Sequence, residues 1–235
     1  MRCLIGLISV AFLTGLSLAQ QEKSAEELAR LPMYERLLKG DDARKAEELN
    51  QSFAECFNAE DWAEARKHAR ALLDFRVQKQ GPDHHEVTDA RLLLVRLDDQ
   101  ARLKPEERRR LAEADQKQKQ LQVLYQQGQY LKAAQLGEEV VVTRKKLVGV
   151  NHPRYAVSLN NLALLYHAMG EHAKAEPLYL QARDLLKKML GENHPDYATS
   201  LNNLAGLYHA MGEYARAEPL YLQARDLRKK LLGEN

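Results

Sequence analysis

Cysteine is scarce in this sequence, which has two among 235 residues, Cys3 and Cys56. Cys3 lies in an N-terminal segment that we expect to be removed, so Cys56 is left alone and an intrachain disulfide is excluded. A single thiol in the apolar-patterned segment FAECF is typical of a small buried hydrophobic residue rather than of a nucleophile.

A surplus of either charge is also lacking. The 35 basic residues nearly balance the 33 acidic residues, which leaves a formal net charge of +2. Because no broad positive field exists, nucleic acid and an anionic membrane surface are both disfavoured as partners. A hydrophobic content of 45% with 29% charged residues is nevertheless ordinary for a chain that folds around a core.

Catalytic motifs are absent as well. The sequence contains no G-x-S-x-G, no H-E-x-x-H, no paired cysteines at zinc spacing and no phosphate-binding glycine loop. Its 12 glycines mostly punctuate the ends of predicted helices. These absences predict a protein that is not an enzyme and that binds no cofactor.

The eight histidines raise the question of a metal site, because His152 and His194 are equivalent in a repeat described below, as are His167 and His209. Equivalent helices in stacked repeats lie about 10 Å apart, whereas two imidazole nitrogens on one zinc ion must lie within about 4 Å of each other. We therefore expect no metal site, and we expect the histidines to be solvated or to line a groove.

One long hydrophobic run is present, from Cys3 to Leu16, and Arg2 precedes it. The small residues Ser17 and Ala19 follow it, a pattern typical of a signal peptide cleaved before Gln20. The run is short for a membrane span, which needs about 20 residues. The sequence therefore predicts export to the periplasm or beyond the cell, with an uncleaved N-terminal membrane anchor as the alternative.

An internal repeat dominates the C-terminal part. The segment that begins at Asn151 recurs from Asn193, which gives a period of 42 residues. Apolar residues at helical spacing form two runs, Tyr155–Met169 and Ala173–Leu190, so each copy is predicted to be a helical hairpin. The copies differ only at the pairs Arg154/Asp196, Val157/Thr199, Leu164/Gly206, His172/Tyr214, Lys174/Arg216, Leu186/Arg228 and Met189/Leu231.

This pattern resembles the tetratricopeptide repeat, in which small residues sit where paired helices approach closely. The positions that carry the resemblance are Leu159, Leu162, Ala163, Tyr166, Ala175, Tyr179 and Ala182, with Leu201, Leu204, Ala205, Tyr208, Ala217, Tyr221 and Ala224 in the second copy. The 42-residue form, with its LNNLA and GEYARAEPLY segments, is similar to repeats of kinesin light chains and of bacterial proteins built from the same units. The resemblance implies an all-α fold of helical hairpins stacked as a right-handed solenoid.

The resemblance fades upstream, and the chain is predicted to divide into a signal peptide (1–19), an N-terminal helical region with a degenerate hairpin (20–103), a decayed repeat (104–150) and two clear repeats (151–192 and 193–235). Ser24 and Glu27 form a capping box that predicts a short helix ending by Gly40. Pro105 predicts a helix start. The basic run 108–110 that follows is interpreted as a solvated helix face, with an acidic-ligand patch as the alternative.

Two asparagine pairs are the candidate site. Asn160–Asn161 and Asn202–Asn203 occupy equivalent places in successive first helices, and an asparagine amide can both donate to and accept from a peptide backbone. By resemblance, Asn161 and Asn203 match the asparagine that holds the ligand in peptide-binding relatives, whereas Val157 and Thr199 replace the lysine of a carboxylate clamp. With His167 and His209, the pairs are predicted to bind a peptide on the concave face; packing between neighbouring repeats is the alternative.

A protein or peptide is therefore the predicted partner, and the chain is predicted to be an interaction scaffold. Two alternatives are a sensor or regulatory segment of a longer effector protein, and an adaptor that assembles with itself through the segment 213–232. For that segment we expect one open apolar face, because repeat arrays need atypical polar ends for solubility.

Overall fold

The structure of the chain is a computed structural model that describes residues 23–233. The predicted signal peptide therefore lies outside the described residues. Every regular element within that range is helical, and none of these helices is long and apolar enough to cross a membrane. The elements are α1 (Ala25–Arg30), η1 (Met33–Arg36), α2 (Gly40–Asn58), α3 (Trp62–Gln80), α4 (His85–Arg102), α5 (Pro105–Gln126), α6 (Tyr130–Leu147), α7 (Pro153–Ala168), α8 (His172–Leu190), α9 (Pro195–Ala210) and α10 (Tyr214–Leu232).

The two clear repeats are the hairpins α7–α8 and α9–α10, as the periodicity predicts. Proline occupies the first turn of α7 and of α9, where its missing amide hydrogen leaves no bond unmade. Gly191 and Gly233 follow α8 and α10 with φ of 84° and 85°, a backbone conformation that other residues adopt at a cost. The helix boundaries therefore follow from local sequence signals.

The decayed repeat forms the hairpin α5–α6, which packs against α7. Pro105 begins α5, and the Lys104 amide donates to Glu107 Oε2 at 3.0 Å across the first turn. Upstream, α1 has the predicted capping box but ends at Arg30, because Pro32 lies directly beyond it and the chain continues into the 3-10 turn η1.

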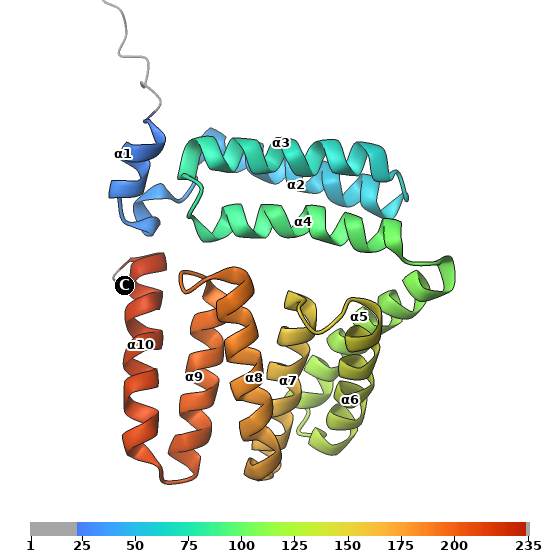
Figure 1. Cartoon of the computed structure of the whole chain (residues 1–235), viewed down its shortest axis with the longest axis vertical. Coiled ribbons are helices and arrows are strands. Elements are labelled where there is room, and N and C mark those ends of the chain that lie inside the picture. The colour runs from blue at the N-terminus through green and yellow to red at the C-terminus, as the bar shows by residue number, and fades with distance from the viewer. Residues whose placement is uncertain (1–22, 234–235) are drawn as a thin grey trace, which may run out of the picture.

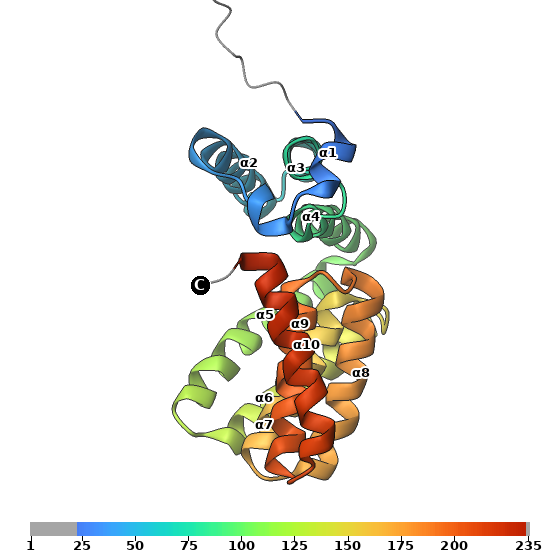
Figure 2. The ribbon, with the colours of Figure 1, turned by 90° about the vertical axis from the view of Figure 1, so that its left-hand side faces the viewer.

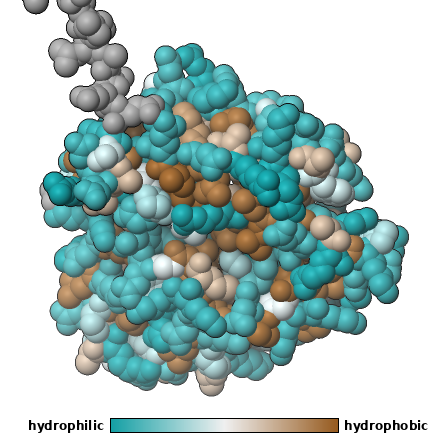
Figure 3. Space-filling model, turned by 45° about the horizontal axis from the view of Figure 1, so that its top comes forward, coloured by the Kyte–Doolittle hydropathy of each residue, from teal (hydrophilic) through white to brown (hydrophobic). Residues whose placement is uncertain are grey.

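The molecule has two layers whose helices run in different directions (Figure 1). Helices α5 to α10 stand side by side, whereas α2, α3 and α4 lie across one end of that array. The turned view shows the same division, with α2–α4 above the ends of the array helices (Figure 2). The face on the side of α2–α4 is largely hydrophilic, and its hydrophobic residues gather in a band across the middle (Figure 3).

The array core uses alanine where helices approach and larger residues around it. Ala163, Ala175 and Ala205 have no exposed surface, and Tyr179 is equally buried beside them. Such close approach is the packing that the repeat pattern predicts, and the all-α solenoid of tetratricopeptide-type hairpins is confirmed. Cys56 is a free, half-buried thiol beside Phe53 and Phe57.

The linker histidines are not solvated, and the expectation of groove-lining or solvated side chains is wrong for them. His84, His152 and His194 are 0%, 7% and 4% exposed. Each accepts a hydrogen bond at Nδ1 from the backbone amide two residues on, at 3.3, 3.1 and 3.1 Å. Each therefore caps the N-terminus of a helix, which is why the side chain turns inward.

Two of these histidines, His152 and His194, also lie against α4 of the other layer, and a ring that accepts at Nδ1 can donate from Nε2. His194 Nε2 lies 3.2 Å from Asp89 Oδ1, and His152 Nε2 lies 2.9 Å from Asp99 Oδ2. Both carboxylates belong to α4. The Pro-containing linkers thus fasten α4 across the end of the array.

The end of the array is partly covered by the N-terminal segment. Met33 of η1 is 2% exposed and packs in one cluster with Tyr197, Leu201 and Leu231 of α9 and α10. Arg36 anchors the same turn to the α3–α4 connection, because its two terminal nitrogens bond both oxygens of Asp83, at 2.6 and 3.0 Å. The expected open face is therefore covered at one end of α10.

The rest of that face of α10 is exposed. Tyr214, Leu222 and Leu232 are 61%, 42% and 60% exposed. Tyr221 is 37% exposed, whereas its equivalent Tyr179 in the preceding repeat is completely buried. In α8 the equivalent surface around Tyr179 is covered by the following repeat. In α10 no described repeat follows, and this surface is exposed.

Candidate functional site

The asparagine pairs lie on α7 and α9, the first helices of the two clear repeats. Asn160 is buried, whereas Asn161, Asn202 and Asn203 are half-buried. The side chains of Asn161 and Asn202 make no hydrogen bond to any residue that the structure describes. Each pair therefore combines a position that faces a neighbouring helix with an amide that is free to bond elsewhere.

One hydrogen bond joins the two pairs. Asn203 Nδ2 donates to Asn160 Oδ1 at 3.4 Å, across the interface between successive repeats. Asn160 is buried at this interface. Its hydrogen bond to the next repeat agrees with the alternative that the asparagines serve packing between repeats. Among the four asparagines, Asn161 and Asn202 are the two whose amides make no hydrogen bond to a described residue.

The two candidate histidines differ in their surroundings. His167 is half-buried, with its ring centroid 5.7 Å from that of His172 and 6.5 Å from that of Tyr179. Burial, and then the neighbouring His172, lower the pKa of His167. His209 is exposed, and its ring lies 5.1 Å from the exposed Tyr214. At neutral pH His167 is therefore a neutral group beside the array core.

A polar contact between repeats that the sequence did not indicate lies close to these positions. Tyr208 donates to Glu176 Oε1 at 3.0 Å, and Arg216 Nη2 reaches the same carboxylate at 2.7 Å. The Arg216 guanidinium also stacks over the Tyr208 ring at 3.7 Å from its centroid. Desolvation, and then the bond to Glu176, raise the pKa of Tyr208 to about 12, so its hydroxyl stays protonated and donates.

No group of three or more histidine, cysteine, aspartate or glutamate side chains within residues 23–233 is arranged to hold a metal ion. The first helices of the repeats instead carry amide, hydroxyl and imidazole side chains along the array. Such groups can form hydrogen bonds to a partner.

The family comparison agrees with this arrangement. The model of the tetratricopeptide repeat matches residues 122–188 and 163–230, which together hold α6 to α9 and parts of α5 and α10. Residues 122–230 of the chain thus form tetratricopeptide repeats. Its repeats have the 42-residue period, and proteins of this architecture are helical scaffolds typical of protein–protein interaction and typically not enzymes.

Similar solved structures include BtubC (BKLC) from P. vanneervenii, with 20% identity, a TM-score of 0.47, and coverage of 84% of this chain and 94% of that one. A proposed kinesin light chain from Podosopora anserina, with nearly identical TPR-like repeats, has 22% identity, a TM-score of 0.44, and coverage of 82% and 98%. Among curated proteins nothing matches this chain.

Proposed function

We propose that this tetratricopeptide repeat protein is a non-enzymatic scaffold that binds a peptide or protein along the concave face of its first helices. The observation that carries the proposal is the identical placement of Asn161 and Asn203 on α7 and α9, with a half-buried amide at each position. Asn161 has no hydrogen-bond partner among the described residues, and Asn203 has one long bond of 3.4 Å. Both amides thus have hydrogen-bonding capacity that a ligand backbone can use.

The spacing suits an extended ligand. Packed helices lie about 8 to 10 Å apart, and an extended peptide rises about 3.3 Å per residue, so neighbouring amides on the array match positions a few ligand residues apart. One net hydrogen bond contributes about 0.5 to 1.5 kcal/mol, which corresponds to a two- to tenfold change in affinity. Each Asn→Ala change is therefore expected to weaken binding by that factor, and the double change by more.

The test begins with mass spectrometry of proteins retained on the signal-free chain, followed by affinity measurements with one retained peptide. Asn161→Ala and Asn203→Ala are compared with Gln181→Ala and Gln223→Ala, an exposed pair with the same 42-residue separation on the second helices. Loss of affinity in the asparagine variants alone, at unchanged melting temperature, supports the proposal. A lowered melting temperature with normal binding by the remaining folded protein contradicts it and assigns the asparagines to packing.

The alternative of a self-assembling adaptor rests on one observation, the contrast between exposed Tyr221 and its buried equivalent Tyr179. The hydrophobic surface that a following repeat covers in α8 is available on α10 to a second copy of the chain.

Export remains part of the proposal on the strength of the N-terminal sequence pattern. N-terminal sequencing of the mature protein tests it: Gln20 as the first residue supports export, and Met1 in a cytoplasmic fraction contradicts it.

A further inference from the structure

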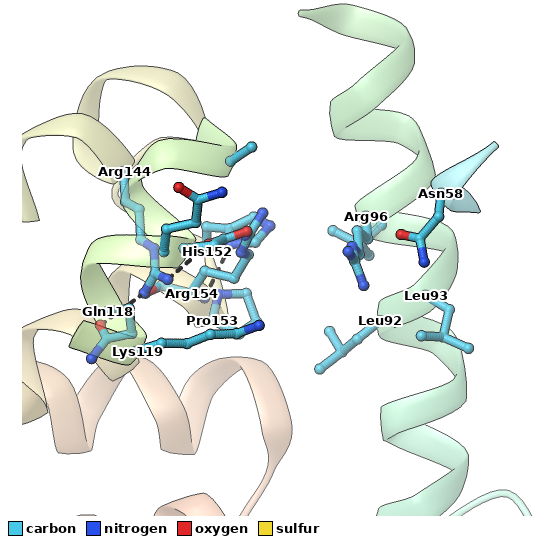
Figure 4. A pocket seen from close by; sticks show the side chains of 14 residues that line it. Asn58, Leu92, Leu93, Arg96, Gln118, Lys119, Arg144, His152, Pro153 and Arg154 are labelled. Atoms are coloured by element: carbon cyan, nitrogen blue, oxygen red, sulfur yellow. Dashed lines mark hydrogen bonds and ion pairs between the residues drawn. The ribbon is translucent and has the colours of Figure 1, made fainter. Parts of the chain in front are cut away.

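A cleft of about 760 Å³ lies between α4 and the start of the repeat array. One wall carries Leu92, Leu93 and Arg96 from α4, and the other carries Arg144 and Arg154 from α6 and α7 (Figure 4). In Figure 4 the Arg96 side chain stands across the open space from the other two arginines. The volume is within the range of about 300 to 1,000 Å³ that is typical of ligand sites.

Three contacts join the two walls of the cleft. Leu92 packs against the buried cluster of Ala156, Leu186 and Leu190, which belongs to α7 and α8. Near the far end of α4, Arg102 Nη2 donates to the Leu147 carbonyl at 3.0 Å. The His152–Asp99 contact at 2.9 Å lies at the same junction. These contacts cross from one layer to the other on both sides of the cleft.

On the array side of the cleft, the Asp115 carboxylate forms ion pairs with the guanidinium groups of both Arg144 and Arg154. Arg144 is 5% exposed, and its Nη2 lies 3.0 Å from Asp115 Oδ1, while Arg154 bonds Asp115 Oδ2. Arg144 is further fixed by Ser158 Oγ at 2.7 Å and the Arg154 carbonyl at 3.0 Å. Asp115 therefore neutralises one of two buried or half-buried positive charges, and the wall stays cationic.

Two more cations face the cleft without a carboxylate. Neither Arg96 nor Lys119 has an acidic group within ion-pair distance among the residues that the structure describes. Arg96 is half-buried and lies 3.9 Å from the centroid of the Phe57 ring, which fixes its position. Burial, and then the charge of Arg154, lower the pKa of Arg96, and the charge of Asp115 offsets only part of that decrease. A charge that is desolvated and repelled in this way is stabilised when an anion enters.

We infer that this cleft binds an acidic peptide segment, with ligand carboxylates at Arg96 and Lys119 and ligand apolar side chains against Leu92 and Leu93. The mixture of cations and leucines on facing walls favours such a peptide over a polyphosphate. Phosphate sites typically add a glycine loop or a helix N-terminus with free amides. No glycine lines the cleft, and the N-terminus of α7 that does line it offers no free amide at its first two residues, because Pro153 has no amide hydrogen and the Arg154 amide donates to His152 Nδ1 at 3.1 Å. The site shares no residue with the asparagine track on α7 and α9, so it does not depend on the function proposed above.

The basic run 108–110, which the sequence offers as an alternative acidic-ligand patch, is a different surface. Arg108 donates to the carbonyls of Gln100 and Leu103 at 3.0 and 3.3 Å, and exposed Arg109 pairs with Glu113 at 3.6 Å. These side chains are used within the protein or face solvent. The cationic groups of the cleft come instead from α4, α5, α6 and α7.

Fluorescence anisotropy with two labelled peptides tests the inference. The probe LEDLDEL carries carboxylates and leucines, and LQNLNQL replaces each carboxylate by its amide. We expect the acidic probe to bind at least tenfold more tightly at low salt, with the difference shrinking as added salt screens the charges. Equal affinity for both peptides, or no binding of the acidic probe, would overturn the inference.

Variants then locate the bound probe. Arg96→Gln is expected to weaken binding of LEDLDEL about tenfold and Lys119→Gln about threefold, since Lys119 is exposed. Neither change removes a hydrogen bond within the described protein, so the melting temperature of Lys119→Gln should be unchanged. That of Arg96→Gln should fall only slightly, through the loss of the stacking on Phe57. Arg225→Gln on α10 is the matched control, an exposed arginine beside Asp226. Unchanged affinity in Arg96→Gln, or an equal loss in Arg225→Gln, contradicts the assignment.

Two further arms separate this site from other ligands. Asn161→Ala should bind the acidic probe normally, because it belongs to the proposed peptide track; a loss there equal to that of Arg96→Gln would refute a separate cleft site. ATP added as a competitor should displace the probe only weakly. Displacement by ATP as effective as that by unlabelled LEDLDEL would overturn the choice of an acidic peptide in favour of a phosphate ligand.

Discussion

Met33→Ala is expected to loosen the attachment of the N-terminal segment to the last two helices of the array. Met33 is 2% exposed and packs with Tyr197, Leu201 and Leu231, residues far from it in sequence. Shortening a buried methionine to alanine loses the transfer free energy of the removed atoms and leaves a cavity, which together cost about 2 to 4 kcal/mol. We therefore expect the free energy of unfolding to fall by that amount.

Urea unfolding followed by circular dichroism measures the loss, and hydrogen exchange locates it. Amides of α9 and α10 near the cluster should exchange faster in Met33→Ala, whereas those of α5 should not. Leu222→Ala is the matched control, because Leu222 lies on α10 but is 42% exposed. That change is expected to cost under 1 kcal/mol.

A double-mutant cycle with Leu231→Ala completes the test. Residues in one packed cluster interact, so the two changes together should differ from the sum of the single effects by about 0.5 kcal/mol or more. Additive effects, combined with a loss of under about 0.5 kcal/mol for Met33→Ala, would refute the attachment of η1 to the array end.

Three further predictions follow from single sites. Gly206→Ala in α9 should raise the free energy of unfolding by about 0.5 to 1 kcal/mol in urea unfolding, because an added methyl group meets other atoms only at 3.6 and 3.8 Å. Gly137→Ala should gain nothing, since two leucine methyl groups lie at 3.2 and 3.3 Å, and a larger gain there contradicts the packing. Burial, and then the charge of its neighbour His85, lower the pKa of His84 to about 4, so its folded form resists protonation that the unfolded chain accepts below about 6.5. Stability should consequently fall by about 2 kcal/mol between pH 6.5 and pH 4, and His84→Asn should flatten that dependence in urea unfolding at the two pH values. Light scattering should show concentration-dependent self-association that Tyr221→Glu abolishes; a monomer at high concentration would contradict it.

The sequence predicted the repeat array well because its signals are local. Prolines at the first turns of α7 and α9, glycines after α8 and α10, and a 42-residue period determine hairpins without reference to the rest of the molecule. The position of α2–α4 was not predicted, since it depends on contacts such as His194 with Asp89, 105 residues apart. No local pattern marks such a pairing before the fold is known.

The candidate site illustrates the same limit at the scale of single residues. Asn160 and Asn161 are chemically identical neighbours, yet one is buried against Asn203 and the other has a free amide. That distinction depends on the angle between successive repeats. The acidic-peptide cleft was missed for a related reason: Arg96, Asp115 and Arg154 come from three helices, and the nearly neutral net charge hides their local concentration.

The spacing of two carboxylates on α4 matches the spacing of two successive linkers of the repeat array. These carboxylates, Asp89 and Asp99, are ten positions apart and thus about 15 Å along the helix axis, and each lies against the histidine of one of two successive linkers. An inserted repeat between α8 and α9 would bring a third His-Pro linker to a helix of 18 residues that offers it no matching carboxylate. An added repeat at this position would therefore lack the contact to α4 that each of the two present linkers makes.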